Sequence, residues 1–375
     1  MKITILALHL GYGGIEKFIS NIANMFEKEN QVEIISIYKL YDKPAFYINP
    51  NVKIKYLLEN LKPNREEFYK SIKSLNIIEI IKQSYIAIKI LYLKKYKMKQ
   101  AIKKLKSDVV ISTIAPHNKL LSKYGKKEWI TIATEHNYKG TDKKYVDKVI
   151  NSCKNLNYLV IASKQLTHIY TSNMKNAKCK LVNIPLCLDN VPQKVSNLKS
   201  KEITYIGRLS EEKGVIDLIE VFKKVHEKDS SIILNIVGEG TKKDDMLAKA
   251  KEYDLENNII FHGFKQRNQI EEIMLNTSIG INTSYTESFG LAVLETFSFG
   301  IPCVAFSSAE GLREIIDNNK NGYLIENRNF EEMSQKIIEL TVDEETRNKM
   351  GYNAREKSLV YTEERIKEKW YKLLK

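Results

Sequence analysis

Cysteine is scarce in this chain of 375 residues. The four cysteines, Cys153, Cys179, Cys187 and Cys303, are scattered, and no two of them form a C-x-x-C pair. Neither a zinc site nor a disulfide framework is therefore indicated. This usage is typical of a protein that works in a reducing cytoplasm.

Long hydrophobic runs are absent as well. No uncharged apolar stretch reaches the ~18 residues that a membrane-spanning helix requires. The N-terminal sequence MKITILALHLGYGG is short, is interrupted by Gly11, Gly13 and Gly14, and is followed by no small-residue cleavage site. We therefore predict that it forms the first core strand rather than a signal peptide.

The chain does contain enough apolar sequence for real cores. Hydrophobic residues make up 43% of it, which argues against a disordered protein. With ~150 residues per domain as a guide, the length predicts two or three domains.

The net charge of +14 is unevenly distributed. Residues 1–200 carry about +20 and residues 201–375 about −6, so the two halves are expected to meet different partners. The densest basic run, IKQSYIAIKILYLKKYKMKQAIKKLKS at residues 81–107, holds nine lysines and no acid.

Ile, Leu, Tyr and Met are interleaved in this basic run, a pattern that suits an anionic membrane surface. The candidate membrane or acceptor contacts are Lys94, Lys95, Lys97, Lys99, Lys103 and Lys104. A solvated helix is the alternative interpretation. Nucleic acid is not expected as a partner, because the run is nearly free of arginine and no recognised nucleic-acid motif accompanies it.

Short β-branched runs alternate with helical patterns along the whole chain. The predicted strands are KITILAL, VEIISIY, VKIKYLL, DVVIST, WITIATE and YLVIAS in the first half, and EITYIG, IILNIVG, NIIFHG, IGINTS and PCVAFS in the second. Continuous apolar strands separated by helices indicate parallel sheets covered on both faces.

A polar stretch at residues 187–202, which contains Pro192, separates the two series of strands. We therefore predict two doubly wound α/β domains that face each other, with ligands bound between them at the carboxyl ends of the strands. The predicted divisions are a first domain, a linker, a second domain and a C-terminal helix anchored by Trp370 and Leu373, at residues 1–190, 191–201, 202–355 and 356–375.

The first strand leads into GYGGIEKF, a glycine loop that opens a helix. Gly13 and Gly14 would let backbone N–H groups approach a phosphate at the helix N-terminus. A dinucleotide fingerprint would require glycine at position 16, where Glu16 stands. A turn without a ligand is the alternative.

The second domain opens with ITYIGRLSEEKGVIDLIEVF. Arg208, next to Gly207, and Lys213 follow the carboxyl end of the strand, where two cations could neutralise a diphosphate without a metal. The alternative is that they form surface salt bridges with Glu211 or Glu212.

The stretch IILNIVGEGTKKDD carries further candidate binding groups. Gly238 and Gly240 in it permit the close backbone approach that a planar base would require. Lys243 stands where the third glycine of a dinucleotide fingerprint would be.

The stretch TESFGLAVLETFSFGIP, at residues 286–302, predicts a helix that starts near Ser288 or Phe289 and ends at Gly300. Glu287 would lie beside the free N–H groups at the helix start, and Glu295 two turns further on. Carboxylates accept hydrogen bonds well from paired hydroxyls. The alternative is that Glu287 only caps the helix and Glu295 is solvated.

These motifs occur in a fixed order: GGIEKF, GR-x4-KG, GEG and E-x7-E, followed by AEGLREIIDNNKNGYLIE at residues 309–326. In this order and at these separations, they resemble glycosyltransferase family 4, the retaining nucleotide-sugar transferases with the GT-B fold. The resemblance covers nearly the whole chain. It implies two Rossmann-like domains, with the acceptor on the first, the donor on the second and the C-terminal helix crossing back to the first.

The resemblance also assigns roles. Arg208 and Lys213 would bind the donor diphosphate and stabilise the leaving group, Glu287 would contact the sugar hydroxyls, and Glu295 would hold the ribose. Gly13 and Gly14 would face the phosphate, and the amides around Phe289, Gly290 and Leu291 would meet sugar or phosphate. His136, in IATEHNYKG, matches a histidine at the reacting sugar, although His117 in IAPHN also ends a strand. A structural role for His136 is the alternative.

The chain contains no D-x-D triplet, so the metal-dependent alternative glycosyltransferase fold is not expected, and we predict neither metal nor cofactor. The predicted activity is transfer of a sugar from a nucleotide-diphosphate donor to a lipid-linked or glycolipid acceptor in bacterial capsule, exopolysaccharide or lipopolysaccharide assembly. The predicted location is the cytoplasmic face of the cell membrane. A soluble-acceptor enzyme or epimerase of the same fold, and a non-enzymatic basic membrane-binding protein, are the alternatives.

Overall fold

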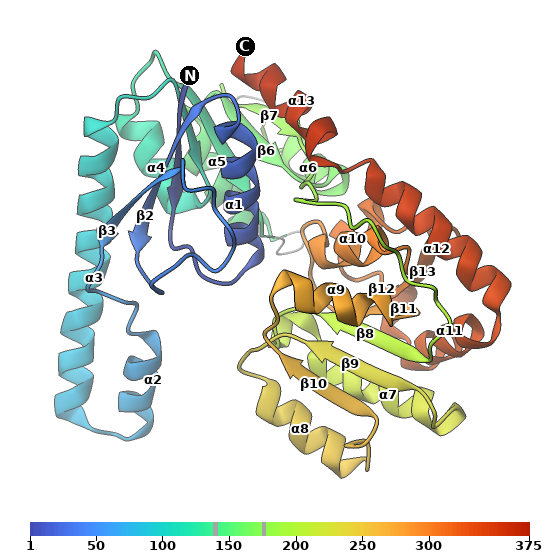
Figure 1. Ribbon diagram of the computed structural model, residues 1–375. Coiled ribbons are helices and arrows are strands. Elements are labelled where there is room, and N and C mark those ends of the chain that lie inside the picture. The colour runs from blue at the N-terminus through green and yellow to red at the C-terminus, as the bar shows by residue number, and fades with distance from the viewer. Residues whose placement is uncertain (138–141, 175–177) are drawn as a thin grey trace.

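The computed structural model describes residues 1–137, 142–174 and 178–375. These residues form two α/β domains, each with one parallel sheet between layers of helices (Figure 1). The predicted fold class is confirmed.

The first sheet has seven strands in the order β3-β2-β1-β4-β5-β6-β7. The strands are β1 Lys2–Ala7, β2 Gln31–Tyr38, β3 Lys53–Leu58, β4 Val109–Ser112, β5 Ile130–Glu135, β6 Tyr158–Ile161 and β7 Lys180–Asn183. The helices are α1 Gly14–Glu27, α2 Arg65–Lys73, α3 Ile77–Lys104, α4 Ala115–Tyr124, α5 Lys143–Cys153 and α6 Lys164–Thr171.

Side chains on the first sheet alternate between two apolar cores. Ile3 and Ile5 of β1 point into the core that contains α1, whereas Leu6 points into the core that contains α3, α4 and α5. Both faces of the sheet are therefore covered, which explains the nearly continuous apolar strands in the sequence. Strand β7 was not predicted because its sequence, KLVN, is short and lies at the sheet edge with no fully buried residue.

The second sheet has six strands in the order β10-β9-β8-β11-β12-β13. The strands are β8 Glu202–Ile206, β9 Ile233–Val237, β10 Ile259–Gly263, β11 Ile279–Asn282, β12 Cys303–Phe306 and β13 Gly322–Ile325. The helices are α7 Val215–Lys228, α8 Lys243–Glu252, α9 Arg267–Leu275, α10 Leu291–Ser298, α11 Phe330–Val342, α12 Glu344–Leu359 and α13 Glu363–Leu374, with short 3-10 turns η1 Glu211–Lys213, η2 Glu310–Glu314 and η3 Glu326–Arg328.

The strand order reverses beside the first strand of each sheet, where β1 meets β4 and β8 meets β11. In open parallel sheets, ligands bind at the carboxyl ends of the strands at such a reversal. The glycine loop follows β1, Arg208 follows β8 and Glu287 follows β11. We call the surface formed by these loops of both domains the interdomain face.

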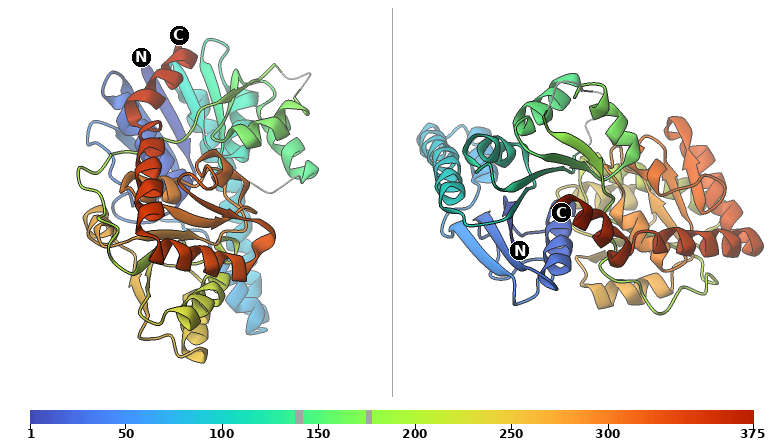
Figure 2. Two further views of the ribbon diagram at one scale, coloured as in Figure 1. Left: turned by 90° about the vertical axis from the view of Figure 1, so that its right-hand side faces the viewer. Right: turned by 90° about the horizontal axis from the view of Figure 1, so that it is seen from above.

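The C-terminal helix crosses back to the first domain (Figures 1 and 2). Trp370 is 1% exposed, and its ring centroid lies 6.2 Å from that of Phe18 and 5.9 Å from that of Phe26 in α1. Leu373 is buried too. The predicted helix over residues 356–375 is divided differently, since α12 continues to Leu359 and α13 begins at Glu363.

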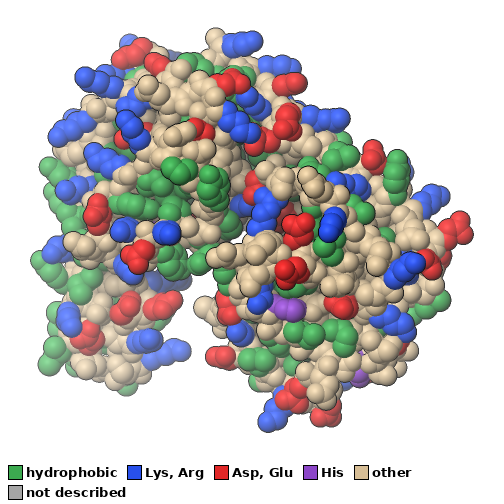
Figure 3. Space-filling model, viewed as in Figure 1, with side chains coloured by type: hydrophobic (Ala, Val, Ile, Leu, Met, Phe, Trp, Pro, Cys, Tyr) green, Lys and Arg blue, Asp and Glu red, His purple; other side chains and the backbone are tan. Residues whose placement is uncertain are grey.

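Helices α2 and α3 form an antiparallel pair that extends beyond the first sheet (Figure 1). The amide of Asn64, at the start of α2, donates to the backbone oxygen of Gln83 in α3 at 2.8 Å. Figure 3 shows a hollow between this pair and the second domain.

Candidate active site

Arg208 projects from the loop after β8 and is largely open. Its side chain is 54% exposed, and its Nη1 lies 3.7 Å from Oε1 of Glu212. The predicted alternative of a surface pair with Glu212 is thus present, but a pair this long and exposed contributes only about 0–1 kcal/mol. The guanidinium remains available to a ligand.

Lys213 and Glu287 form a tight ion pair between two loops of the second domain. The Lys213 Nζ lies 2.6 Å from Oε1 of Glu287, and the Ser284 hydroxyl donates to the same oxygen at 2.9 Å. Gly214 makes the approach possible: it has a φ of 60°, and a Cβ there would lie 2.0 Å from the backbone oxygen of Thr283. The loops after β8 and β11 are thereby locked together.

Helix α10 begins later than predicted. Its first residue is Leu291, and Gly290 occupies the N-cap position with a φ of 95° and no side-chain capping bond. The alternative that Glu287 caps the helix is therefore wrong. Among the described residues, the amide N–H groups of Phe289, Gly290 and Leu291 make no hydrogen bond, so they form an open set of donors. The Phe289 side chain itself is buried against Tyr361.

Glu295 lies in the second turn of α10. Burial raises the pKa of its carboxyl to about 7, while the nearby Lys17 and Arg267 lower it and Asp189 raises it. Within the described residues, its carboxylate makes no hydrogen bond or ion pair. The alternative of a freely solvated acid does not fit this environment, because the side chain is half-buried and loses part of its hydration.

Asp189 joins the domains beside Glu295. Its Oδ2 lies 2.5 Å from Nζ of Lys17 in α1 and 3.5 Å from Nη1 of Arg267 in α9. Two elements from different domains thus share one carboxylate in the segment between β7 and β8, which we call the connecting segment.

The glycine loop of the first domain approaches Arg208. A Cβ on Gly13 would lie 2.2 Å from Oε2 of Glu16 and 3.1 Å from Nη2 of Arg208, whereas a Cβ on Gly14 would have no atom within 4 Å. Nδ1 of His9 lies 3.3 Å from Oε1 of Glu16. Burial raises the pKa of Glu16, opposed by His9 and Arg208.

His9 and Glu16 were not predicted as site residues. Glu16 was noted only because it replaces a fingerprint glycine. Its spacing of two residues from Gly14 at a helix start was the available signal, because the first turn of a helix that follows a sheet reversal faces the ligand edge.

His136 lies directly after β5 and packs against α1. Its Nε2 lies 2.7 Å from Oγ1 of Thr134, and its ring centroid lies 4.4 Å from that of Phe18. Burial lowers its pKa to about 3, so the imidazole is neutral at ordinary pH. The carboxylate of Glu135 accepts the backbone N–H groups of His136 and Asn137 at 3.0 and 2.7 Å, which fixes the backbone that carries the ring.

His117 is buried near the start of α4, and burial lowers its pKa to about 4. It is buried within the first domain.

The remaining predicted glycines of the second domain pack against neighbouring backbone. A Cβ on Gly238 would lie 1.8 Å from the backbone oxygen of Gly207, and one on Gly240 would lie 2.1 Å from that of Leu209. The close approach that these glycines permit is therefore made to the loop after β8. Contact with a base stays a prediction.

The predicted basic segment lies in α3. Lys95, Lys97, Lys103 and Lys104 are exposed, and Lys94 and Lys99 are half-buried. The ammonium groups of Lys99 and Lys103 lie 5.1 and 5.3 Å from the ring centroid of Tyr124 in α4. These two lysines are partly engaged within the first domain.

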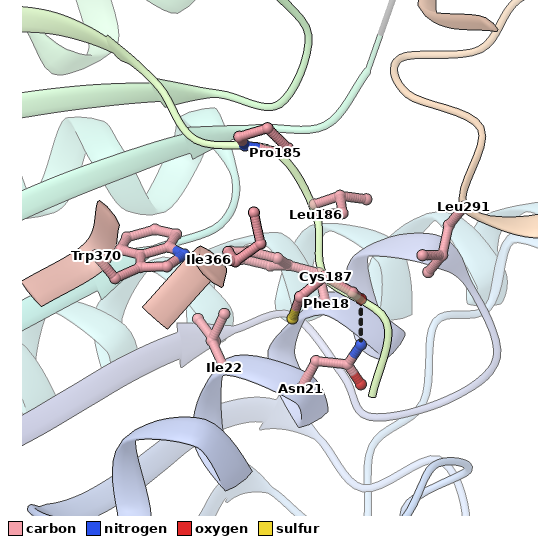
Figure 4. Close-up of a pocket in the computed structure, with 9 residues that line it drawn as sticks. All are labelled: Phe18, Asn21, Ile22, Pro185, Leu186, Cys187, Leu291, Ile366 and Trp370. Carbon is pink, nitrogen blue, oxygen red and sulfur yellow. Dashed lines mark hydrogen bonds between the residues drawn. The ribbon is translucent and has the colours of Figure 1, made fainter. Parts of the chain in front are cut away.

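A small apolar pocket lies behind the interdomain face (Figure 4). Asn21 of α1 donates to the backbone oxygen of Cys187 at 3.1 Å there. The lining consists of Phe18, Asn21 and Ile22 of α1, Pro185, Leu186 and Cys187 of the connecting segment, Leu291 of α10, and Ile366 and Trp370 of α13. Since none of these side chains is charged, the pocket is part of the joint between the domains rather than a diphosphate site.

Within the described ranges, no helix is long and apolar enough to cross a membrane. No group of three or more His, Cys, Asp or Glu residues that could hold a metal ion occurs in that part of the chain.

Two facing doubly wound domains, with cations, acids and open amides on loops at the carboxyl ends of their strands, define a GT-B glycosyltransferase. The family model described as "Glycosyl transferases group 1" matches residues 189–357. The second domain thus matches this family, and the whole chain has the GT-B fold of the retaining glycosyltransferases of family 4.

Two relatives illustrate the range of similarity. The chain is 34% identical over 174 residues to the poly(ribitol-phosphate) alpha-N-acetylglucosaminyltransferase of Staphylococcus aureus, an alignment that covers 46% of this chain and 35% of that relative. It thus spans about a third of that relative's length. It is 26% identical over 385 aligned residues to an uncharacterized glycosyltransferase of Haemophilus influenzae, covering 100% of this chain and 99% of the relative.

Among solved structures, a mutant of S. aureus TarM in complex with Fondaparinux, alpha-GlcNAc-glycerol and UDP has a TM-score of 0.80 to this chain. The superposition covers 100% of both chains at 19% sequence identity, a level of similarity that concerns the fold alone.

Proposed function

We propose that the protein transfers a sugar from a nucleotide-diphosphate donor, with retention, to a lipid-linked or glycolipid acceptor at the membrane. The process would be assembly of a bacterial capsule, exopolysaccharide or lipopolysaccharide. The observation that carries the donor half is the position of Arg208 beside the locked pair of Lys213 and Glu287, at the carboxyl ends of β8 and β11.

The leaving group explains the cations. When the sugar departs, negative charge develops on the diphosphate, and fixed donors that need no rearrangement stabilise it best. Arg208 is open, Lys213 is held by Glu287, and the N–H groups before α10 have no partner among the described residues. Gly13 and Gly14 bring the first domain to the other side of the same phosphate, with open space above Gly14.

The two acids would bind hydroxyl groups. Oε1 of Glu287 is occupied by Lys213 and Ser284, while its Oε2 makes no hydrogen bond within the described residues and could accept from the donor sugar. Glu295 has both carboxylate oxygens without partners in the same part of the chain, as a ribose with two adjacent hydroxyls requires.

His136 would contact the reacting sugar as a neutral hydrogen-bonding group. Burial lowers its pKa and so favours the neutral imidazole, and its role would be orientation rather than charge. Gly207, Gly238 and Gly240 would shape the loops around the nucleotide.

The acceptor class rests on the surface of the first domain. Besides its lysines, α3 carries a stripe of exposed apolar side chains at helical spacing: Ile77 72%, Ile78 81%, Ile81 64%, Tyr85 66%, Ile88 67% and Tyr92 65% exposed. Contiguous exposed apolar surface mostly marks an interaction site. Apolar and aromatic residues flanked by lysines favour the interface of an anionic bilayer. Basic and hydrophobic side chains are both visible over α2 and α3 in Figure 3.

The relative named for poly(ribitol-phosphate) acts, by that name, on an anionic polymer. A basic first domain suits either an anionic polymer or a lipid diphosphate, because both carry phosphate charge. The apolar stripe favours the lipid-linked form, since a soluble polymer offers it nothing to bury in.

The donor half is tested with UDP-sugars, purified protein and a membrane lipid extract. Sugar transfer to the lipid fraction is expected, and Arg208→Ala should reduce it strongly. Full transfer by Arg208→Ala would refute the diphosphate role, and release of free UDP without any lipid would favour a soluble-acceptor enzyme.

The membrane contact is tested by co-sedimentation with vesicles. Binding to vesicles with phosphatidylglycerol should exceed binding to phosphatidylcholine alone. Ile78→Ser combined with Ile81→Ser should weaken binding to both kinds of vesicle. Lys95→Gln combined with Lys97→Gln should weaken only the binding to vesicles with phosphatidylglycerol. Unchanged binding in both variants would exclude α3 as the membrane contact.

A further inference from the structure

Four aromatic side chains gather on the interdomain face beside the proposed donor site. Tyr12 lies in the glycine loop after β1, Tyr41 and Phe46 follow β2, and Phe264 follows β10 of the second domain. The Tyr12 ring centroid lies 5.3 Å from that of Tyr41, 6.4 Å from that of Phe46 and 4.3 Å from that of Phe264. We call these four residues the aromatic cluster.

The aromatic cluster is accessible, although it joins two domains. Tyr12 is 45% exposed, Tyr41 50% and Phe264 44%. Rings that served only to hold the domains together would be expected to bury most of their surface, because burial is the source of their stabilising energy. About half of each of these three rings is instead presented to solvent.

The backbone holds these rings in place. The backbone N–H of Ala45, next to Phe46, donates to the oxygen of Leu10 at 2.9 Å, which fixes the loop after β2 against the glycine loop. A Cβ on Gly11 would lie 3.1 Å from Cε2 of Tyr41 and 3.3 Å from Nδ1 of His9. The Tyr41 ring and the His9 imidazole therefore border the same glycine.

Polar groups lie along one side of the aromatic cluster. His9 Nδ1 is 3.3 Å from Oε1 of Glu16, and their side chains are 24% and 11% exposed. The ammonium group of Lys17 lies 5.3 Å from the ring centroid of Phe46. An acid and an imidazole thus lie beside the rings, and Lys17, which is also paired with Asp189, lies against the half-buried Phe46.

A pyranose ring has the complementary chemistry. Its axial C–H groups form an apolar face that suits an aromatic ring, and its hydroxyls suit a carboxylate and an imidazole. We propose that the aromatic cluster and the His9–Glu16 pair form a subsite for a pyranose ring of the acceptor. This inference rests on the proposed function, because it assigns the acceptor side of the same site.

The position of the subsite agrees with an acceptor rather than a nucleobase. Three of the four rings, and both polar residues, belong to the first domain, whereas the cations and open amides for the nucleotide lie in the second. A Cβ on Gly13 would lie 2.2 Å from Oε2 of Glu16 and 3.1 Å from Nη2 of Arg208, so the two side chains approach each other beside this glycine. A sugar held by Glu16 would therefore lie next to the cation that binds the departing diphosphate, where the acceptor hydroxyl must attack.

The test uses saturation-transfer NMR with two probes, methyl α-glucopyranoside and methyl N-acetyl-β-glucosaminide, added to the full chain with saturating UDP. Wild-type protein should transfer saturation to the C–H protons of at least one probe. Tyr41→Ala should reduce the signal several-fold, and Tyr41→Phe should retain it because the ring remains. Tyr352→Ala, which removes an exposed tyrosine of α12 (68% exposed), is the matched control.

Thermal stabilisation by UDP is measured on the same variants and should be unchanged in Tyr41→Ala. Loss of UDP stabilisation would mean that the rings hold the nucleotide, and would overturn the proposal. Equal glycoside signals in wild type and Tyr41→Ala, or no signal from either probe with wild type, would overturn it too. Failure of UDP to stabilise wild type would contradict the proposed donor site. The glycoside signals would then still decide whether the aromatic cluster binds a pyranose ring.

Discussion

The ammonium group of Lys213 lies 2.6 Å from Oε1 of Glu287, although 74 residues separate them in the chain. The pair joins the loops after β8 and β11, which are neighbours because the strand order reverses between these strands. One interaction therefore fixes both a cation for the diphosphate and an acid for the sugar.

Substitution of Lys213 should impair catalysis much more than folding. Lys213→Met is expected to lower the rate of transfer by about 100-fold or more, since it removes a fixed charge at the leaving group. The side chains of Lys213 and Glu287 are 24% and 15% exposed, so the loss of stability should be modest. Steady-state kinetics measures the rate of transfer, and thermal unfolding measures the stability. Lys336→Met, which removes a surface pair with Glu339 on α11, is the control. Equal rates in the two variants would contradict the role.

Glu295 should make stability depend on pH. Its pKa is raised from 4.5 to about 7 by burial, so between these values the unfolded chain has released the proton and the folded protein retains it. Stability should therefore fall as pH rises through this window, by about 3 kcal/mol in total from this group, and the loss should be complete above the folded pKa.

The comparison is urea unfolding of wild type and Glu295→Gln across this pH range. The variant keeps the shape and loses the titration, so the difference in unfolding free energy should change with pH by that amount. If the unfolding free energies of wild type and Glu295→Gln changed with pH in parallel, the pKa of the Glu295 carboxyl would not be raised by folding. A donor that binds through the ribose should also bind more weakly to the variant.

Gly311 should control the position of Glu287. A Cβ there would lie 2.4 Å from the carbonyl carbon of Ser288 and 2.5 Å from both the oxygen of Glu287 and the nitrogen of Phe289. These are backbone atoms, so Gly311→Ala must displace the loop, and displacement by about 1 Å can cost about 100-fold in rate. Kinetics should show a much larger effect than circular dichroism, and an unchanged turnover number would disprove the coupling.

Trp370 should anchor α13 to the first domain. Trp370→Ala removes a ring that is 1% exposed and packs against Phe18 and Phe26, with an expected loss of about 3–5 kcal/mol. Chemical denaturation measures it, against Tyr352→Ala, which is expected to change stability little because that ring is 68% exposed. A loss below about 1 kcal/mol would mean that the crossing helix is not held by this ring.

Much of the fold could be predicted from local sequence. Each of the eleven predicted strands is present because buried parallel strands are continuously apolar. Two strands of four residues were not predicted. Strand β7 lacks that apolar signature, and β13 lies within the longer motif at residues 309–326. The start of α10 was placed too early, since only the left-handed backbone of Gly290 shows that the loop continues past Phe289.

The sequence by itself determined the fold class, the family and the residue types of the donor site, because periodicity, glycine turns and motif order are local properties. The tertiary structure decided which groups are paired and which are open. Lys213 is bound to Glu287, the half-buried Glu295 has no partner among the described residues, and Glu16 meets His9 beside Arg208. Desolvation and contact depend on which loops the two sheets bring together, and spacing along the chain does not specify that.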